Sequence, residues 1–262
     1  YKYKFDSVFI FQTSPVFVGI PASIISYFKK SSQIMWILDL WPETLSAVGI
    51  FKRKWQIEII RKFVNVIYSR CDVLLTQSKS FKKEIKNFER NRIIYFPAWS
   101  ESDFINASKE PAKEIKFQKD KFTLMFAGNI GEAQDFPSII KTADYLIKLN
   151  FNDFRIVIIG EGRKKDWLRS EIKKRKLDKH FELLDKYPLK RIPSFFAHAD
   201  ALLVSLTKKD VFKLTIPGKV QTYLSSGIPI LGMIEGEGAS VIRDSKSGYV
   251  CNSGDYKNLS KF

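Results

Sequence analysis

The sequence contains little cysteine and histidine, and both shortages exclude kinds of site. Of 262 residues only Cys71 and Cys251 are cysteines and only His180 and His198 are histidines. Neither type occurs in the closely spaced pairs that hold zinc or build a disulfide framework, so we expect no zinc centre and a reducing, cytoplasmic compartment. No Asp-x-Asp stretch occurs either. A divalent cation held by two nearby carboxylates is therefore not expected.

The sequence also lacks an apolar run long enough to cross a membrane. The best candidate, residues 16–28 (VFVGIPASIISYF), falls short of the roughly 20 residues that a spanning helix needs. We expect this segment to be a buried helix behind a buried strand. Because the chain starts with Tyr and enters the strand-like FDSVFIF almost at once, we also expect it to be a piece of a longer protein.

Acidic residues are the minority among the charged ones, with 28 Asp and Glu against 44 Lys and Arg. The formal net charge of +16 and the isoelectric point near 9.7 predict an anionic partner. Nucleic acid, acidic lipid headgroups and phosphorylated small molecules all fit, and charge alone does not choose among them. A hydrophobic content of 45% favours a globular chain over a disordered one.

Short apolar runs alternate with longer segments of helical period, the pattern of parallel strands joined by crossover helices. A first set of strands is predicted at SVFIF, IMWIL, DVLLT and RIIYF, and a second at FTLMFAG, FRIVIIG, FELL, ALLVSL, IPILGM and GYVC. Between them lies a polar, lysine-rich stretch around residues 98–121. We predict an α/β protein with domains at 1–105 and 121–262 and a linker at 106–120.

Two predicted helices carry clear apolar stripes. In PSIIKTADYLIKL, Pro137 suits a first helical turn and the apolar residues after it share one face that can cover a sheet. Residues 51–70 place Trp55, Ile59, Phe63 and Val66 on one face among many basic residues, including Lys52. Such a helix suits either an anionic membrane surface or a solvated outer face, and the second interpretation is favoured.

The stretch LTIPGKVQTYLSSGIPIL starts a helix with Pro217, Gly218 and Lys219, where an acidic residue is usually preferred. The N–H groups of a first helical turn have no intrahelical partner, and the helix dipole adds positive charge there. Glycine lets a ligand approach the backbone, and Lys219 adds a full positive charge. The stretch predicts a phosphate site as well as it predicts an ordinary helix with an exposed lysine.

Two further turns follow predicted strands and could take part in the same site. Gly128, Asn129 and Gly131 form a glycine-containing turn before a helix, and the turn IIGEGR brings in Arg163, whose guanidinium can grip phosphate. Because ligands of parallel α/β sheets bind at the carboxyl ends of strands, we expect these turns to converge with the one at Lys219 on a diphosphate. Each turn by itself is also compatible with tight strand-to-helix packing.

Several segments together resemble a known family; they are QTSP, DLWPETL, GNIGEAQDF, IIGEGR, AHADALLVSL and TIPGKVQTYLSSGIPIL. They resemble the bacterial family 4 glycosyltransferases of GT-B fold, which build O-antigen, capsule and exopolysaccharide repeat units. The resemblance runs from about residue 6 to about residue 255. It implies two Rossmann-like parallel-sheet domains facing a cleft, with the acceptor in the amino-side domain and the nucleotide-sugar in the carboxyl-side domain. It also implies that the amino-side domain is incomplete here.

The resemblance assigns roles to matching residues of this chain. The donor diphosphate would be bound by Gly128, Asn129, Gly131, Pro217 and Gly218, and its charge would be neutralised by Lys219 and Arg163. The loop from Tyr187 to Ile192 would lie near the nucleobase. In DLWPE, Asp39 and Glu43 would face the acceptor as candidate bases, and Trp41 would face it as a stacking surface. Many relatives carry a pair of glutamates where this chain has Leu214 and Thr222.

From these residues we expect a retaining transferase that needs neither metal nor cofactor and moves a sugar from a nucleoside-diphosphate sugar, hexosyl or N-acetylhexosaminyl, to a glycan or polyprenyl-linked acceptor. Fixed N–H donors and cations are the metal-free way to stabilise a leaving diphosphate. We expect it at the inner face of the cell membrane, attached peripherally to anionic lipid around residues 51–62. The alternatives are a nucleic-acid-binding module, which the scattered basic residues disfavour, and a catalytically inactive nucleotide-binding subunit.

Overall fold

The computed structural model describes residues 3–47, 49–51, 53–85, 88–89, 92–105, 110–116 and 118–262. Its internal contacts divide the chain into two compact units. Unit 1 holds the described residues up to Ala98 together with Lys209–Ile216, and unit 2 holds those of Trp99–Lys208 and Pro217–Phe262. Lys52 of the predicted basic helix and positions 106–109 and 117 of the predicted linker lie outside the described residues.

Unit 1 is built on a four-stranded parallel sheet in the order β1-β2-β3-β4. Its elements are β1 (Ser7–Gln12), η1 (Val16–Val18), α1 (Gly19–Lys29), β2 (Ser32–Ile37), α2 (Glu43–Ala47), α3 (Lys54–Ser69), β3 (Val73–Thr76), α4 (Lys79–Glu84), β4 (Ile93–Tyr95) and α8 (Asp210–Leu214). The four strands predicted for this half of the chain are all confirmed.

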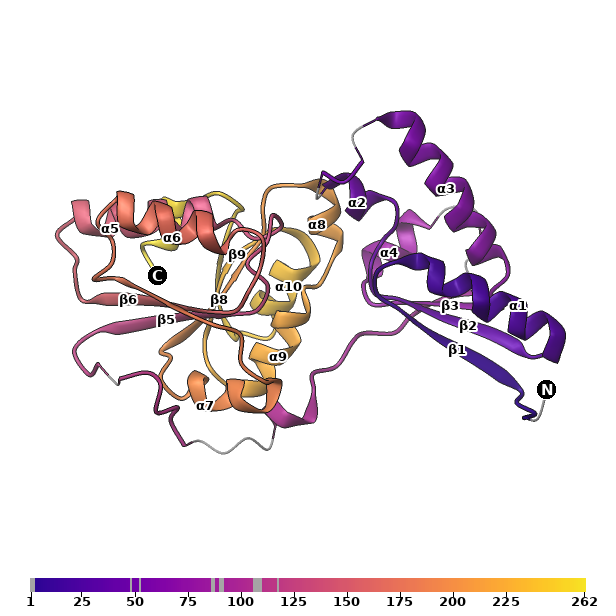
Figure 1. Cartoon of the computed structure of the whole chain (residues 1–262), viewed down its shortest axis with the longest axis horizontal. Helices are drawn as coiled ribbons and strands as arrows, with labels where there is room; N and C mark the ends of the chain where they lie inside the picture. The colour runs from indigo at the N-terminus through magenta and orange to yellow at the C-terminus, as the bar shows by residue number, and fades with distance from the viewer. Residues whose placement is uncertain are drawn as a thin grey trace. The chain divides into compact units, whose positions relative to one another are not determined.

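Helices α1 and α3 cover one face of this sheet (Figure 1). The core of unit 1 includes Ile10, Met35 and Leu74 of the strands, which are buried in one cluster with Ile67 of α3. The opposite face carries Phe9 and Phe11, which are 53% and 56% exposed. Side chains alternate between the two faces of a strand, so β1 is buried on one side only. The expectation of a buried strand followed by a buried helix is therefore wrong.

Helices α1 and α3 also turn apolar side chains outward. The stripe of Trp55, Ile59, Phe63 and Val66 is 46–58% exposed, because α3 packs through a second apolar face that includes Ile67. Gly19 of α1 makes this packing possible, since a Cβ there would lie 2.4 Å from Cγ2 of Ile67. None of the helices in the described residues is long and apolar enough to span a bilayer.

Helix α8 belongs to unit 1 although the chain reaches it from a strand of unit 2. Ser78 Oγ donates a hydrogen bond of 2.6 Å to the carbonyl of Leu214, and Val211 and Phe212 of the same helix are buried. Hydrophobic periodicity along the chain does not reveal which neighbour such a short helix will pack on. The predicted domains 1–105 and 121–262 differ from the observed division in this segment, and their limits at 105 and 120 stay predictions.

Unit 2 is a six-stranded parallel sheet in the order β10-β9-β8-β5-β6-β7. Its elements are η3 (Ser102–Phe104), β5 (Phe122–Ala127), α5 (Phe136–Lys148), β6 (Phe154–Ile159), α6 (Lys165–Lys174), β7 (Phe181–Leu184), η4 (Leu189–Arg191), α7 (Ile192–Phe196), β8 (Ala201–Ser205), α9 (Gly218–Ser226), β9 (Ile230–Met233), α10 (Gly236–Asp244), β10 (Gly248–Cys251) and α11 (Tyr256–Leu259). All six strands predicted for this half are confirmed.

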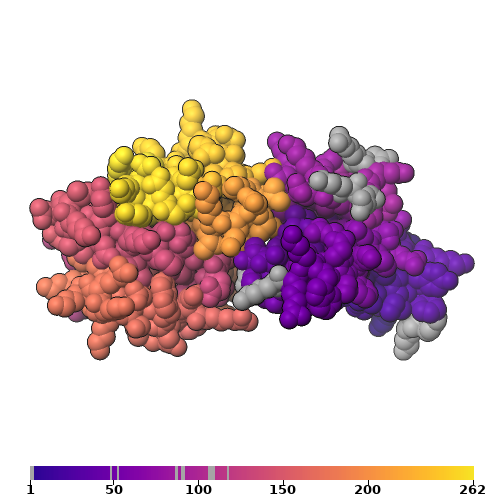
Figure 2. Space-filling model, turned by 90° about the horizontal axis from the view of Figure 1, so that it is seen from above, coloured from indigo at the N-terminus to yellow at the C-terminus, as the bar shows by residue number. Residues whose placement is uncertain are grey.

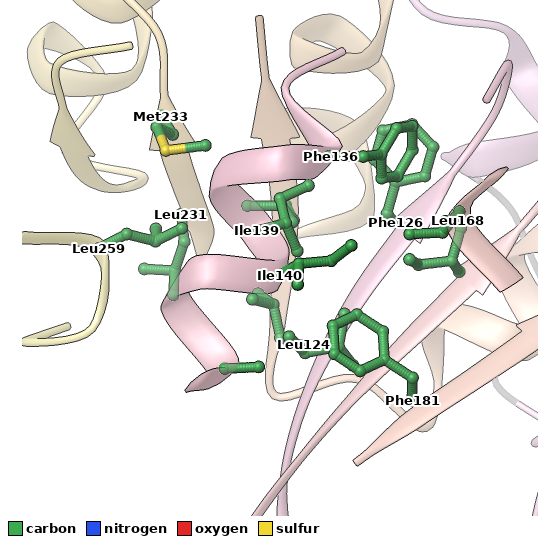
Figure 3. Packing of buried hydrophobic residues seen from close by; sticks show 14 of the residues in the cluster. Leu124, Phe126, Phe136, Ile139, Ile140, Leu168, Phe181, Leu231, Met233 and Leu259 are labelled. Carbon is green, nitrogen blue, oxygen red and sulfur yellow. The ribbon is translucent and has the colours of Figure 1, made fainter. Parts of the chain in front are cut away.

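Helices cover both faces of this sheet, as is usual for parallel sheets. On one face Ile139 and Ile140 of α5 pack against Leu124 and Phe126 of β5 (Figure 3), which confirms the stripe predicted after Pro137. The carboxyl-terminal helix α11 lies beside α5 on this side (Figure 2), where the rings of Tyr145 and Tyr256 meet edge to face. Helices α7, α9 and α10 cover the other face.

The strand order reverses direction at β5. The chain runs from β5 to β6 and β7 on one side, and β8, β9 and β10 follow on the other. A crevice forms at such a reversal because the crossover connections leave in opposite directions, and ligands of open α/β sheets bind there, at the carboxyl ends of the strands. The fold thus indicates where unit 2 would hold a ligand.

Candidate functional site

Unit 2 contains a cavity of about 530 Å³ at the carboxyl ends of β5 and β6, beside the reversal of strand order. Its wall is formed by the turns after β5, β6 and β7, by α9, and by part of the segment that precedes β5. The lining residues are Glu101, Phe104, Ala127, Gly128, Asn129, Ile159, Gly160, Glu161, Gly162, Lys186, Tyr187, Leu189, Ile192, Phe196, Lys219, Thr222 and Tyr223. Its volume suits a small-molecule ligand.

The amine of Lys219 enters this cavity next to Gly128. A Cβ on Gly128 would lie 2.6 Å from Lys219 Nζ, so only the absence of a side chain lets the two turns approach. The turns that were expected to converge do line one cavity. Lys219 Nζ also lies 4.6 Å from the ring centroid of Phe126, and it has no ion-pair partner among the described residues.

Burial lowers the pKa of the Lys219 amine from 10.5 to about 8, with desolvation as the cause. Lys165 differs from Lys219 because its amine is paired with the carboxylates of Glu161 and Asp185. A desolvated cation without a carboxylate is a costly arrangement, and an anionic ligand would relieve that cost. The cavity therefore has an unsatisfied positive end.

Tyr223 anchors α9, the helix that carries Lys219, and the sequence pattern does not predict this role. Its hydroxyl accepts a hydrogen bond of 3.1 Å from the N–H of Ala127, which ties α9 to the end of β5. Its ring is 1% exposed, and residues four apart lie on the same face of a helix. The spacing from Lys219 to Tyr223 is the signal that could have found it.

The turns after β5 and β6 are joined back to back through glycine. Gly160 has φ +151°, and a Cβ there would lie 1.9 Å from the carbonyl oxygen of Gly128. The N–H of Gly128 donates to Ile159 and that of Ile130 donates to Glu161. The glycines of IIGEG therefore allow the backbone turns after β5 and β6 to lie in contact, and the two turns together form one rim of the cavity.

The other residues predicted for the diphosphate lie at different depths. Asn129 lines the cavity, whereas Gly131 lies behind it with its N–H bonded to Gln134 Oε1. Pro217 is the N-cap of α9 rather than its first residue, and the space in front of Gly218 is open. Arg163 is exposed and does not line the cavity. Its predicted role in binding phosphate stays a prediction.

Tyr187 belongs to an apolar wall at the other end of the cavity. Its ring packs on Phe195 with centroids 4.5 Å apart, and Leu189 and Ile192 extend the surface. Phe196 closes the wall and contacts the ring of Phe104, with centroids 5.8 Å apart. Phe104 lies just before the predicted linker, where polar composition hid its part in the cavity. A flat aromatic or heterocyclic group fits such a wall.

The residues predicted to face the acceptor, Asp39, Trp41 and Glu43, all belong to unit 1. Burial raises the pKa of the Asp39 carboxyl, which accepts hydrogen bonds from Thr44 Oγ1 at 2.6 Å and from Trp41 Nε1 at 3.3 Å. Trp41 is 7% exposed, so stacking on a sugar would need its ring to leave the core. The carboxylate of Glu43 is paired with Arg61. Trp41 and Glu43 line a smaller cavity of about 180 Å³ within unit 1.

No group of three or more His, Cys, Asp or Glu side chains in the described ranges is arranged to hold a metal ion. The polar residues that line the larger cavity include two lysines and two glutamates together with an amide and hydroxyl groups; they are Lys186, Lys219, Glu101, Glu161, Asn129, Thr222 and Tyr223. Such a set can bind a phosphate at one end and hydroxyl groups at the other. Independence from metals and cofactors stays a prediction.

The sequence matches the family described as "Glycosyl transferases group 1" over residues 107–261. It is also 26% identical over 159 residues to a protein of Escherichia coli K12 named as a colanic acid biosynthesis glycosyl transferase, WcaI. That match covers 58% of this chain and 38% of WcaI. The chain thus spans well under half of the length of the curated relative.

Solved structures share the fold at low sequence identity. Anabaena Alr3699/HepE, solved with UDP and glucose, superposes with a TM-score of 0.73 at 12% identity, over 98% of this chain and 67% of that one. A variant of S. aureus TarM, solved with fondaparinux, α-GlcNAc-glycerol and UDP, gives 0.64 at 16% identity, over 92% of this chain and 45% of that one. These neighbours confirm the predicted GT-B class with two Rossmann-like parallel-sheet domains.

Proposed function

The chain belongs to the glycosyl transferases group 1 family, and we propose that it transfers a sugar from a nucleoside-diphosphate sugar to a glycan or polyprenyl-linked acceptor in bacterial surface-polysaccharide synthesis. The observation that carries this proposal is the unpaired, desolvated amine of Lys219 beside Gly128. The relative WcaI supports the pathway class, and neighbours solved with UDP support the donor class. The transferred sugar would be a hexosyl or N-acetylhexosaminyl group.

Lys219 would act on the leaving group. Breaking a sugar–diphosphate bond places negative charge on the diphosphate, and a fixed cation in a poorly solvated cavity stabilises that charge. The backbone N–H groups of Asn129, Gly218 and Lys219 have no hydrogen-bond partner among the described residues and would add donors. We propose that these groups, with Arg163 at the rim, do without a metal ion or cofactor and that the sugar keeps its anomeric configuration.

Tyr187 and the apolar wall around it would hold the nucleobase. The wall lies in the same cavity as Lys219, so one nucleotide could contact both ends. Aromatic and aliphatic side chains bind the faces of a heterocycle without selecting one base strongly. The identity of the base is left open by this wall, and both uracil and guanine nucleotides belong in a binding screen.

We propose Asp39, rather than Glu43, as the group that assists deprotonation of the acceptor, together with the departing phosphate. Burial raises the pKa of Asp39 towards the range in which a carboxylate can take up a proton. Glu43 is committed to its ion pair with Arg61. Trp41 would then position Asp39 through its indole N–H.

A membrane location is the second part of the proposal. The outer side of α3 exposes Trp55 and Phe63, that of α1 exposes Tyr27 and Phe28, and Lys62 adds positive charge. Aromatic and basic side chains on an amphipathic helix bind the headgroup region of anionic bilayers. We propose peripheral attachment at the cytoplasmic side of the cell membrane through this surface, and no nucleic-acid partner.

Co-sedimentation with vesicles tests the membrane proposal. The double variant Trp55→Ala/Phe63→Ala should lose binding to vesicles that contain anionic phospholipid, while Leu149→Ala, at an equally exposed position of unit 2, should bind as wild type does. Equal binding of wild type to neutral and to anionic vesicles would contradict the proposal.

Turnover tests the transferase proposal. The full-length protein should release nucleoside diphosphate from a nucleotide-sugar in the presence of acceptor, and Lys219→Ala should reduce the rate by a factor of 100 or more, on the order of the loss seen when one charge-stabilising donor is removed. Lys173→Ala, an exposed lysine near the end of α6, should leave it unchanged. Nucleotide binding without any turnover would indicate the inactive-subunit alternative instead.

A further inference from the structure

Two acidic residues, Glu101 and Glu161, line the cavity that holds Lys219, and Glu161 is paired with Lys165. Glu101 lies just before η3, and it lines the cavity together with Lys219 although 118 positions of sequence separate the two. Its side chain has no ion pair in the described part of the chain. A carboxylate repels phosphate, so its presence needs another explanation than the diphosphate.

Thr222 of α9 holds this carboxylate. Its Oγ1 donates a hydrogen bond of 3.4 Å to Glu101 Oε2, across 121 positions of sequence. The hydroxyl has a single proton, which it shares between this carboxylate and the carbonyl of Gly218 one turn earlier, at 3.2 Å. The contact is long, and it leaves Oε1 of Glu101 without a recorded partner among the described residues.

Lys219 and Thr222 are three residues apart, so they stand one above the other on α9, with about 5–6 Å between their Cβ atoms. Burial alone lowers the pKa of Lys219, so the carboxylate of Glu101 does not neutralise the amine. The cavity therefore receives a cationic side chain from one turn of α9 and a carboxylate that contacts the next turn of the same helix. A nucleotide has the matching polarity, because one methylene separates its α-phosphate from a ribose that carries two neighbouring hydroxyl groups.

We propose that Glu101, held by Thr222, accepts hydrogen bonds from the vicinal 2′- and 3′-hydroxyl groups of the ribose of the bound nucleotide. A carboxylate can accept from both hydroxyls at once, and acidic residues bind ribose in this way in other Rossmann-like sites. Helix α9 (Gly218–Ser226) has no acidic residue of its own, so Glu101 supplies a carboxylate beside it from a different segment. This inference rests on the proposed nucleotide-sugar function.

Calorimetric titration of the full-length protein with UDP and GDP, each beside its 2′-deoxy counterpart, tests the assignment. Wild type should prefer the ribonucleotide by about tenfold or more, as expected for a hydrogen bond to a charged group. Glu101→Ala should weaken both nucleotides, the ribonucleotide by about tenfold more than the 2′-deoxynucleotide, which has only its 3′-hydroxyl to lose, so that the preference disappears. Asp178→Asn, which removes an exposed carboxylate ahead of β7, should behave as wild type does.

The possible failures are distinguishable. An unchanged preference in Glu101→Ala, or tighter binding of UDP because a repulsive charge has gone, would overturn the assignment and leave the transferase proposal intact. So would a loss confined to UDP-glucose relative to UDP, because Glu101 would then receive hydroxyls of the transferred sugar. Wild type that binds no nucleoside diphosphate would overturn both proposals. Since Glu101 is exposed, its replacement should not prevent folding.

Discussion

The side-chain amine of Lys219 occupies the space that a side chain on Gly128 would fill, with 2.6 Å between Nζ and the Cβ position. Gly128 also has φ +138°, a conformation that side chains disfavour. The absence of a side chain at Gly128 therefore lets the Lys219 amine reach the backbone turn. The contact joins the end of β5 to α9, the two elements that flank the reversal of strand order.

Gly128→Ala should displace the amine and weaken binding of a nucleoside diphosphate by about tenfold. The atom that its Cβ meets ends a flexible side chain, so the stability cost, about 1–2 kcal/mol, should come from the strained φ of +138°. Gly160→Ala should behave differently. Its Cβ would meet the Gly128 carbonyl oxygen at 1.9 Å, so the free energy of unfolding should fall by about 2–4 kcal/mol. Chemical denaturation and calorimetric titration of both variants check this, and equal stability losses would speak against the packing described.

Binding should depend on pH through Lys219. Its pKa of about 8 means that the free protein loses this charge above pH 8, so the affinity for a diphosphate should fall by up to about tenfold per pH unit there. Titrations between pH 7 and 9.5 should show this loss in wild type and a flat profile in Lys219→Met over the same range. Parallel profiles in the two proteins would mean that another group controls binding.

The desolvated amine of Lys219 should lower the free energy of unfolding. Because its pKa is lower in the folded chain than the ordinary 10.5, the unfolded chain binds more protons between pH 8 and 10.5, and the stability that this group confers rises with pH in that window. Below pH 8 its cost is fully present. Lys219→Met should therefore raise the melting temperature at pH 7 by a few degrees, as about 2–4 °C corresponds to 1 kcal/mol in chains of this size. A lower melting temperature would contradict the account of Lys219 as an unpaired, desolvated cation.

Tyr223→Phe should loosen α9 from β5. Loss of the bond from the Ala127 N–H should reduce stability by about 1–2 kcal/mol and nucleotide affinity several-fold, because a buried donor is left unpaired and Lys219 is less firmly placed. Tyr145→Phe in the core-side contact with Tyr256 is the matched control, and it should leave affinity unchanged. Wild-type affinity in Tyr223→Phe would show that Lys219 keeps its position without this tie.

On the acceptor side, Asp39→Asn should lower turnover by a factor of about 100 while leaving nucleotide affinity unchanged, because the variant keeps the shape of the carboxylate and loses its basicity. Glu43→Gln should affect stability through the lost pair with Arg61 more than it affects turnover. Steady-state rates and direct nucleotide titration separate the two. A larger loss of turnover in Glu43→Gln would reverse the assignment.

The sequence predicts the strands well, and it predicts that the turns at Gly128 and Lys219 meet at one cavity, because buried parallel strands are short apolar runs and turns are marked by glycine. It does not predict which face of a helix with two apolar faces is buried. Helix α3 buries Ile67 and exposes Trp55, because Gly19 leaves room for the Ile67 side chain. It also misses Glu101 and Phe104, which reach the cavity from a polar segment without periodicity. Trp41 shows the same limit, because it is buried in the core cluster of unit 1, which includes residues distant from it in sequence, such as Tyr68.

The most direct test of the account is calorimetric titration of UDP and GDP into the full-length wild-type protein, Lys219→Ala and Lys173→Ala at pH 7. We predict that wild type and Lys173→Ala bind at least one of the two nucleotides alike, and that Lys219→Ala binds it at least tenfold more weakly, as expected for the loss of a charged hydrogen bond. Equal affinity of Lys219→Ala and wild type would contradict the claim that the cavity beside Gly128 holds a diphosphate.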